Sequence, residues 1–366
     1  MHERSECVSA LEPQRSSQQT WKFATPTGLP CMQAILFRHQ LEIRARYWWY
    51  RLKVLLGQNV NVDKNFFPSD AAMRLSQGIL PKGTRITCAG RSDGVGMQAL
   101  ARMSGINFAE AFGATYVDTP FKYIDHAPGD MEAWIAAWEA LFHFDKGHDQ
   151  VDNGKYNIID YSDYLLNKHE INDNTVLRFQ QCYWLNRLYP DTFSEVTGDF
   201  QHKYGFPTQR DDEGHVFVAV HIRRGDVGTH VNALRFTPNE KILTTIRCLK
   251  EIEQRLGVTF SIEIFSQGKA SEFAEFSELG CRLHLDADAV WTMRKLIEAD
   301  LLVMSKSSFS YVAALINRGV KIYEPTFNPP LSAWVVKRGD GSFDKEIVKV
   351  RLAEHLGDKV QLAFAQ

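Results

Sequence analysis

His215-Val216-Phe217-Val218-Ala219-Val220-His221-Ile222-Arg223-Arg224-Gly225-Asp226 is the stretch that decides the fold. Six of the seven residues from Val216 to Ile222 are apolar, and several are β-branched. A continuous apolar run of this length predicts a strand that is buried on both faces, as in a parallel sheet. The charged residues that follow fall just beyond the carboxyl end of that strand, where open α/β sheets bind ligands. Two adjacent arginines there can meet a diphosphate with fork-shaped donors, although an isolated arginine pair is equally expected on a solvated loop.

The sequence after this strand alternates regularly between strand and helix patterns. Further strands are expected at 260–265, 282–285, 300–304 and, as the last one, 320–323. Helices are expected between them at 238–256, 270–279, 290–298 and 308–317. Alternation with short links predicts a doubly wound parallel sheet.

Polar clusters follow three of these strands, at 221–226, at Ser266-Gln267-Gly268 and at 305–310. In a doubly wound sheet they would share one edge. The third cluster opens a helix, so free backbone N–H groups and serine hydroxyls could bind an anion there. Ordinary N-capping would also explain Ser307 or Ser308, but it would not explain why arginines and serines converge on one edge.

An earlier part of the chain predicts a second α/β unit. A strand at 84–88, a glycine-rich turn at 89–96, a helix at 97–112 and a strand at 114–117 form one β-turn-α-β unit. The turn, with Gly94 and Gly96, could present backbone N–H groups to an anion or a sugar hydroxyl. Its spacing is neither a dinucleotide fingerprint nor a Walker loop. Beyond it we expect a strand at 156–160, a helix at 175–189 and an inter-domain linker at 201–214.

The loop at 118–126 is dense in polar and aromatic groups. Asp125 and His126 could hydrogen-bond sugar hydroxyls, although an Asp-His pair is more often structural. The helix after this loop carries Trp134, Trp138 and Phe142 on one face, a stripe that favours core packing over a sugar platform.

Composition excludes several classes of protein. The chain has 366 residues, which suggests two domains, and a net charge of -2 gives no reason to expect a nucleic-acid partner. The six cysteines form no Cys-x-x-Cys pair, and together with the lack of an Asn-x-Ser/Thr sequon they favour a reducing, cytoplasmic compartment. No apolar run approaches the roughly 20 residues of a membrane span, and we expect no signal peptide.

The first 56 residues divide into two parts. Residues 1–31 are polar and predict a mobile arm. Residues 32–56 look helical, with apolar side chains interleaved with arginines and lysines. This segment could pack on the main body, or residues 38–56 could make a peripheral membrane contact, an alternative that Trp48-Trp49 keeps open.

A family resemblance rests on three of these motifs. Val-His-Ile-Arg-Arg-Gly-Asp, at 220–226, resembles the His-x-Arg-Arg-x-Asp motif of inverting fucosyltransferases, a group that spans the alpha-1,6, alpha-1,2 and protein O-fucosyl types. Residues 299–310 are similar to the later Ala-Asp-x-Leu-Val…Ser-Ser-Phe-Ser segment of that group, and Gly94-Val95-Gly96-Met97-Gln98 is similar to its Gly-x-Gly-Asn-Gln turn. The resemblance covers roughly residues 84–325 and implies an α/β fold with two Rossmann-like domains facing a cleft, the GT-B architecture of glycosyltransferases.

The resemblance also implies roles for single residues. Arg223 would bind the β-phosphate of GDP-fucose and stabilise the leaving diphosphate in place of a metal. Arg224 would support the arginine loop, Asp226 would hold it through hydrogen bonds, and His221 would lie near the nucleoside. Ser305, Ser307 and Ser308 would lie beside the diphosphate, and Gly94, Gly96, Gln98, Asp125 and His126 would face the acceptor.

The chain departs from the pattern at three places. His230 stands where the alpha-1,6 type has a glutamate, so it is the candidate general base. Met97 replaces the usual asparagine, and Ser266-Gln267 replaces an acidic residue that often reads guanine, a role that Asp286 or Asp288 could take. Asp286-Ala287-Asp288 also matches an Asp-x-Asp metal pattern, but it lies late in the domain, and we expect no metal.

The sequence thus predicts three parts: an arm and amphipathic extension at 1–80, an acceptor-side domain at 81–214 and a donor-side domain at 215–366. The expected activity is an inverting, metal-independent transfer of fucose from GDP-fucose to a glycan or other hydroxyl acceptor, with no cofactor. Two alternatives stay open: another nucleotide-sugar donor, and a non-catalytic protein that binds a nucleotide or carbohydrate.

Overall fold

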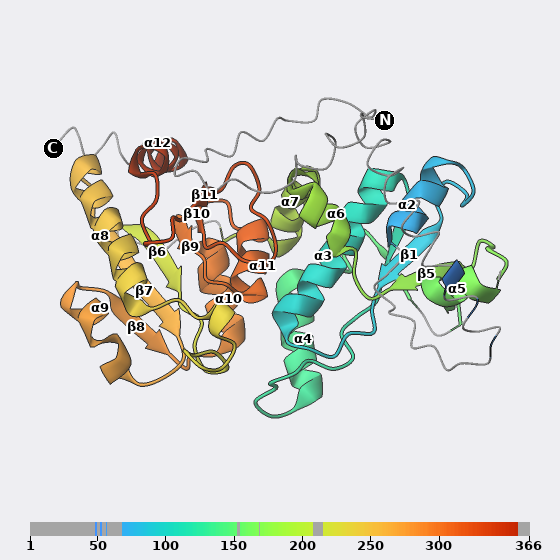
Figure 1. Ribbon diagram of the computed structural model, residues 1–366, viewed down its shortest axis with the longest axis horizontal. Helices are drawn as coiled ribbons and strands as arrows, with labels where there is room; N and C mark the ends of the chain where they lie inside the picture. Colours follow the sequence, from blue (N-terminus) through green and yellow to red (C-terminus); the bar gives the residue numbers. More distant parts are fainter. Residues whose placement is uncertain are drawn as a thin grey trace, which may run out of the picture.

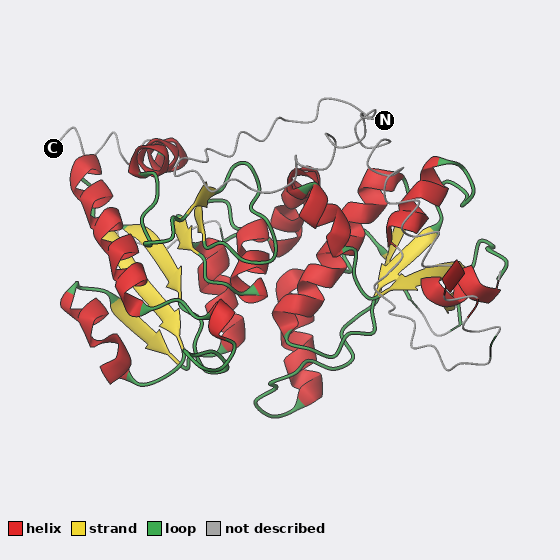
Figure 2. Ribbon diagram, viewed as in Figure 1, coloured by secondary structure: helices red, strands yellow, loops and turns green. Residues whose placement is uncertain are grey.

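The computed structural model of the protein describes Trp48, Trp49, Leu52, Leu56 and residues 68–151, 154–167, 169–207 and 215–357. These residues form two separate parallel β-sheets with helices packed around them (Figures 1 and 2). The predicted fold class, α/β with two Rossmann-like domains, is confirmed by the two sheets and their purely parallel pairing.

The amino-terminal sheet has the strand order β3-β2-β1-β5-β4. Its strands are β1 (Arg85–Cys88), β2 (Thr115–Asp118), β3 (Asp149–Gln150), β4 (Asn157–Asp160) and β5 (Thr175–Phe179). Its helices are α2 (Pro68–Ser76), α3 (Val95–Phe112), α4 (Met131–Phe142), α5 (Tyr161–Asn167), α6 (Tyr183–Leu188) and α7 (Phe193–Tyr204). Strand order reverses between β1 and β5, which are hydrogen-bonded neighbours in parallel register. That reversal creates a crevice at the carboxyl ends of these two strands.

The carboxyl-terminal sheet has the order β11-β10-β9-β6-β7-β8, which is the order 3-2-1-4-5-6 of a dinucleotide-binding Rossmann domain read from the other edge. Its strands are β6 (Val216–His221), β7 (Phe260–Ser266), β8 (Arg282–Leu285), β9 (Leu301–Val303), β10 (Val320–Tyr323) and β11 (Val335–Val336). Its helices are α8 (Asn239–Leu256), α9 (Ala274–Glu278), α10 (Ala289–Glu298), α11 (Ser308–Ile316) and α12 (Lys345–Leu356). Here the order reverses between β6 and β9, which are also parallel neighbours.

Local sequence explains where these elements begin. Asp130, Asp288, Ser307 and Asp344 are N-caps whose side chains accept a hydrogen bond from the first turn of α4, α10, α11 and α12, respectively. β6 is buried along most of its length because it lies in the middle of its sheet, between β7 and β9. The uninterrupted apolar run of the opening stretch follows from that central position.

The two sheets are joined by one hydrophobic core. Helices α3, α4 and α7 pack against α10 and α11, and the buried residues of both groups form a single cluster (Figure 1). At its centre, the fully buried Trp138 ring stacks on Phe142 at 5.7 Å and meets Phe309 edge-on at 6.2 Å. The predicted core role of the Trp138 and Phe142 stripe is therefore confirmed. Polar contacts add to this core, including the hydrogen bond from the Tyr204 hydroxyl to Glu298 (2.6 Å).

Three of the predictions for these elements are wrong. Residues 175–189 are not one helix: Thr175–Phe179 is strand β5, and the helix α6 begins only at Tyr183. The predicted linker at 201–214 overlaps the end of α7, which continues to Tyr204. The strand at 320–323 is confirmed as β10, but it is not the last strand, because β11 follows and pairs with it. In each case the propensity pattern was overridden by pairing or packing with distant residues.

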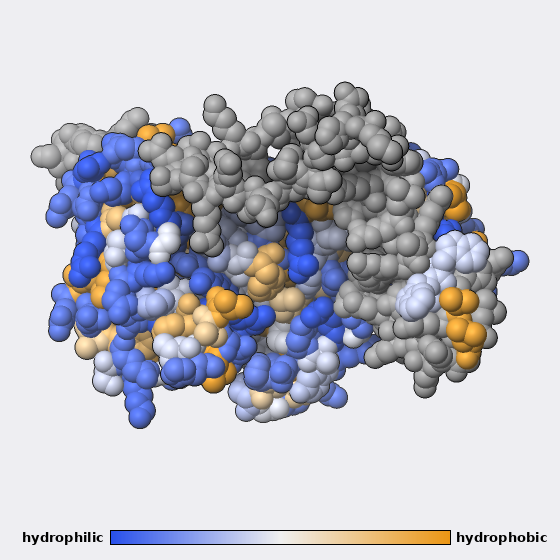
Figure 3. Space-filling model, in the orientation of Figure 1, coloured by the Kyte–Doolittle hydropathy of each residue, from blue (hydrophilic) through white to orange (hydrophobic). Residues whose placement is uncertain are grey.

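Most of the predicted arm and amphipathic helix, including the proposed membrane-contact segment 38–56, lies outside the described residues. Trp48 and Trp49 are described as helical and exposed. Among the described helices, none combines the length and the apolar character that a bilayer span requires. On the face shown in Figure 3, hydrophilic residues predominate and apolar ones form small patches.

Candidate functional site

The strand reversal between β6 and β9 brings together two of the three predicted polar clusters. The arginine motif follows β6, and the serine cluster follows β9. In doubly wound sheets, ligands bind in the crevice that such a reversal opens at the carboxyl ends of the strands. We call the residues that follow these two strands, 221–226 and 305–310, the carboxyl-terminal crevice.

Arg223 is the residue that links the two clusters. Its Nη1 donates to the Ser307 hydroxyl (3.1 Å), while Nε and Nη2 donate to the two carboxylate oxygens of Asp226 (3.2 and 2.6 Å). An arginine has five N–H bonds, and these contacts use three. Two N–H bonds on the terminal nitrogens stay available on a side chain that is 20% exposed.

Asp226 is ionised and holds the guanidinium of Arg223 in place. Burial by itself would raise the pKa of Asp226, but the hydrogen bond and the charge of Arg223 outweigh it and hold that pKa below its usual value. Asp226 is therefore a carboxylate near neutral pH, and the fork of Arg223 is fixed along one edge.

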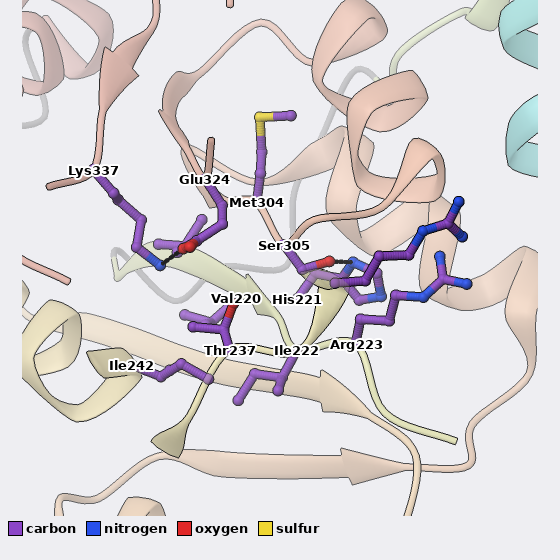
Figure 4. A pocket seen from close by; sticks show the side chains of 12 residues that line it. Val220, His221, Ile222, Arg223, Thr237, Ile242, Met304, Ser305, Glu324 and Lys337 are labelled. Atoms are coloured by element: carbon purple, nitrogen blue, oxygen red, sulfur yellow. Dashed lines mark hydrogen bonds and ion pairs between the residues drawn. The ribbon is translucent and has the colours of Figure 1, made fainter. Parts of the chain in front are cut away.

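His221 and Ser305 form a second contact across the crevice. His221 Nδ1 lies 2.8 Å from the Ser305 hydroxyl, and the imidazole ring packs 5.5 Å from the ring of Phe309 (Figure 4). Burial, reinforced by the nearby charge of Arg223, lowers the pKa of His221 to about 3. The ring is therefore neutral near pH 7, with one protonated nitrogen and one lone pair.

The remaining residues of the arginine motif hold the loop in place. Arg224 donates to the carbonyl of Thr237 (3.0 Å) and to the Asn239 side chain (2.6 Å), which ties the loop to the start of α8. Gly225 has φ 81°, a conformation that L side chains rarely adopt, and a Cβ there would collide with the side chain of Gln267. The turn thus favours glycine at position 225.

The Ser266-Gln267-Gly268 cluster and the Asp-x-Asp sequence have backbone roles. The Ser266 hydroxyl donates to the carbonyl of Ile222 (2.9 Å). Asp286 accepts from the Gly268 N–H (3.3 Å), and Asp288 accepts from Trp291 N–H (2.7 Å) as the N-cap of α10. In the part of the chain that the structure describes, no group of three or more histidine, cysteine or acidic side chains is placed to hold a metal ion.

Sequence reasoning missed a recess beneath the arginine loop. His221, Arg223 and Ser305 line it together with a buried ion pair, Glu324–Lys337 (Figure 4). Its volume is about 10 Å³, the space that one water requires. Glu324 directly follows β10, and Lys337 follows β11, a strand of two residues that gave no pattern of its own.

The glycine-rich turn is a contact between the two domains. A Cβ on Gly96 would lie 2.7 Å from the backbone nitrogen of Phe309 and 2.8 Å from its Cα. The first turn of α3, which Gly94 caps, therefore lies directly against the start of α11, next to Ser307 and Ser308. Close packing of two helices, rather than ligand contact, is the reason for glycine at position 96.

The structure brings the other predicted acceptor residues close to one another, because the Asp125 N–H (3.3 Å) and the Gln98 amide both donate to the carbonyl of Asp93. The Gln98 amide donates to the carbonyls of Asp93 (2.5 Å) and Tyr123 (2.9 Å) and is buried. Asp125 and His126 are exposed and contact each other, and His126 has φ 65°. His230, the candidate base, is exposed on the loop that follows the arginine motif.

A cavity of about 670 Å³ lies at the strand reversal of the amino-terminal sheet. Thr87 and Cys88 of β1 and the residues directly after them line it, with Arg178 of β5 and Gln180 after that strand, Thr119 after β2, Gln150 of β3 and Ile158 of β4. We call it the amino-terminal cavity. Gln98 lines it, and so do parts of the two segments predicted to bind a sugar, 89–91 of the glycine-rich turn and 119–122 of the loop, whereas its wall at β5 was not predicted because β5 was predicted as helix.

Each domain thus carries a candidate ligand site at its strand reversal, as expected for two Rossmann-like domains. No family model matches the chain, and no curated protein matches it. Solved structures similar to it include POFUT1 in complex with GDP, at 13% identity and a TM-score of 0.31 over 66% of this chain and 97% of that one.

Two further structures are similar to the chain. Escherichia coli heptosyltransferase WaaC with ADP-2-deoxy-2-fluoro heptose has 14% identity and a TM-score of 0.32, over 77% of this chain and 98% of that one. A mutant of Arabidopsis thaliana FUT1 in complex with GDP has 11% identity and a TM-score of 0.30, over 76% of this chain and 78% of that one. Since all three TM-scores lie below 0.5, the fold assignment rests on the strand order and register of the chain itself.

Proposed function

We propose that the protein is an inverting glycosyltransferase that transfers fucose from GDP-fucose to a hydroxyl acceptor. The observation that carries the proposal is Arg223, held between Asp226 and Ser307 with two N–H bonds left over at the strand reversal of the carboxyl-terminal sheet. A fixed guanidinium with free donors suits the diphosphate of a nucleotide sugar. The identity of the sugar and base rests on the motif resemblance at 220–226 and 299–310.

The proposed step breaks the bond between the anomeric carbon of the donor sugar and the diphosphate oxygen, and the electron pair leaves with GDP. The new bond joins the anomeric carbon to the acceptor oxygen, whose proton passes to a general base, for which His230 is the candidate. Arg223 and the first turn of α11 would stabilise the negative charge that develops on the leaving diphosphate. No step requires a metal or a cofactor of the protein.

The recess beneath the arginine loop holds only about 10 Å³, so the nucleotide would lie over the crevice rather than inside the recess. The neutral His221, its pKa lowered to about 3, would add no positive charge there. It would instead offer one ring nitrogen to the donor while Ser305 contacts the other.

The proposal is tested by binding and turnover with a nucleotide panel. GDP, GDP-fucose, ADP and UDP are titrated calorimetrically into the full chain, and release of GDP from GDP-fucose is followed with and without a chelator. We expect GDP and GDP-fucose to bind most tightly and turnover to survive the chelator. Tighter binding of ADP or UDP would mean that the donor is not GDP-fucose but a sugar linked to that nucleotide. Nucleotide binding without turnover on a broad acceptor panel would make the protein a binding protein. Absence of binding to every nucleotide would overturn the proposal.

A further inference from the structure

We propose that the amino-terminal cavity is the acceptor site and that the acceptor is an acidic carbohydrate, one that carries a carboxylate, sulfate or phosphate group. The assignment of the ligand as an acceptor rests on the proposed function, whereas the binding of an acidic sugar is inferred from the cavity alone. A volume of about 670 Å³ is in the range of small-molecule sites, which are about 300–1,000 Å³. The cavity lies at a strand reversal, where open α/β sheets bind ligands.

The wall of the cavity is cationic. Its lining includes five basic side chains and, among the described residues, no aspartate or glutamate: the basic residues are Arg91, Arg102, Lys122, Lys155 and Arg178. A ligand inside the cavity therefore meets N–H donors and, from the described residues, no carboxylate. Such a lining favours an anion over a neutral or cationic ligand.

Three of these cations are held in place by carboxylates that stand outside the lining. Asp93 accepts from Nε and Nη2 of Arg91, and Asp160 accepts from Nε (2.8 Å) and Nη2 (3.0 Å) of Arg178. In both arginines the Nη1 group makes no contact to those carboxylates. Arg102 is buried, with its N–H groups committed to Asp118 and Glu139, and it forms part of the fixed wall rather than a ligand contact.

Lys122 supplies the charge that is least compensated. It is exposed, directly follows the buried Phe121, and has no hydrogen bond or ion pair within the described part of the chain. Lys155 is also exposed but lies 3.4 Å from Asp149. Lys122 lines the same cavity as Arg91 and Arg178, and an anionic group on the ligand would supply the carboxylate-like partner that its ammonium lacks.

The rest of the lining suits a sugar. Gln150 and Gln180 offer amide groups for sugar hydroxyls, and the exposed Ile158 provides apolar surface for a pyranose face, whereas the buried hydroxyls of Thr87 and Thr119 bond each other (2.7 Å). Cationic, amide and apolar groups together match a carbohydrate that bears an acid, whereas an inorganic anion would leave the apolar part unused.

The position of the cavity connects it to the carboxyl-terminal crevice. Gly90 and Arg91, which line the cavity, belong to the same turn as Gly96, which packs on Phe309. Ser307, two residues before Phe309, contacts Arg223. The glycine-rich turn therefore lines the cavity at one end and packs at its other end on the start of α11, beside the crevice.

The test is calorimetric titration of the full chain with three acidic sugars and their neutral counterparts. The probes are glucuronic acid, N-acetylglucosamine 6-sulfate and glucose 6-phosphate, compared with glucose and N-acetylglucosamine. At least one acidic sugar should bind about tenfold more tightly than its neutral counterpart, and that binding should weaken with added salt. The three arms identify which acidic group the cavity takes.

Two variants and a matched control assign the binding to the cavity. Lys122→Met and Arg178→Gln should each weaken binding of the acidic sugar about tenfold, while Lys82→Met should leave it unchanged. Lys82 is likewise exposed and in the same domain, but it lies before β1, at the opposite end of the strand. Thermal unfolding of each variant verifies its fold.

The outcomes separate this inference from the proposed function. If no acidic sugar binds more tightly than its neutral counterpart, or if Lys122→Met and Arg178→Gln bind as the wild type does, the inference fails even when GDP binds normally. If an acidic sugar binds through Lys122 but no nucleotide binds, the cavity stands as a site and the glycosyltransferase proposal fails. GDP binding should be unaffected by Lys122→Met in either case.

Discussion

Substitution of Arg223 by alanine is the most direct test of the carboxyl-terminal crevice. The side chain makes three hydrogen bonds to Asp226 and Ser307 and retains two N–H bonds for a ligand. A hydrogen bond to a charged group contributes about 1.5–3 kcal/mol, so loss of the two ligand contacts removes at least about 3 kcal/mol from the transition state. At about 1.4 kcal/mol per factor of ten, kcat/KM for GDP-fucose should fall about 10²-fold or more.

Stability should change much less than activity. Arg223 is 20% exposed and Asp226 47% exposed, and an ion pair of such exposure contributes about 0–1 kcal/mol to folding. The assay is therefore steady-state release of GDP from GDP-fucose, together with thermal unfolding of the same preparations. Arg223→Lys keeps the charge but loses the fork, and its kcat/KM should lie between those of the wild type and the alanine variant.

Arg255→Ala is the matched control. Arg255 also pairs with a carboxylate, that of Glu346, but it lies near the end of α8, away from the crevice. Its removal should leave kcat/KM unchanged. The reasoning is refuted if Arg223→Ala retains kcat/KM within about threefold of the wild type, because the two free N–H bonds would then have no role in the transition state.

Three further predictions concern packing, buried charge and pH. Gly96→Ala should destabilise the fold by about 1–3 kcal/mol, because its Cβ would meet backbone atoms of α11, whereas Gly198→Ala, in an open position on α7, should stabilise it by up to about 1 kcal/mol; chemical denaturation compares the two. Arg102→Met should cost about 3–5 kcal/mol in the same measurement, because it leaves Asp118 charged and fully buried, and adding Asp118→Asn should recover part of that loss. The free energy of unfolding should fall as the pH drops from about 6.5 toward 3. In this range His221 takes up a proton in the unfolded state but not in the folded state, where its pKa is lowered to about 3. His221→Gln should flatten this pH dependence, and an unchanged slope would contradict the assignment.

The carboxyl-terminal domain was predictable because its strands are central and continuous. β6 reads as an apolar run and β7 as an alternation of apolar and polar residues, and polar residues follow at the point where each strand ends. The topology rules for parallel sheets then place those polar ends on one edge. The contact between Arg223 and Ser307, 84 positions apart in the chain, is the geometric result of that rule.

The amino-terminal domain was less predictable because few helix- or strand-breaking residues separate its elements. Between the end of β5 at Phe179 and the start of α6 at Tyr183 there are three residues, Gln180-Gln181-Cys182, none of them glycine or proline. Without a breaker, the apolar residues of strand and helix merge into one helical pattern. The strand forms because it pairs with β1 and β4, and this pairing cannot be read from the local sequence.

That error concealed the β5 side of the amino-terminal cavity. With β5 read as a strand next to β1, the order β3-β2-β1-β5-β4 has its reversal between β1 and β5, and the same rule that locates the carboxyl-terminal crevice points to the residues after Cys88 and Phe179. Arg91 and Arg178 would then have stood out as basic side chains at one edge, as Arg223 did in the other domain. The glycine-rich turn was instead assigned to the ligand, although Gly96 serves to bring α3 against α11. The same turn also supplies Gly90 and Arg91 to the lining of the cavity, so it packs on α11 at one end and meets the cavity at the other.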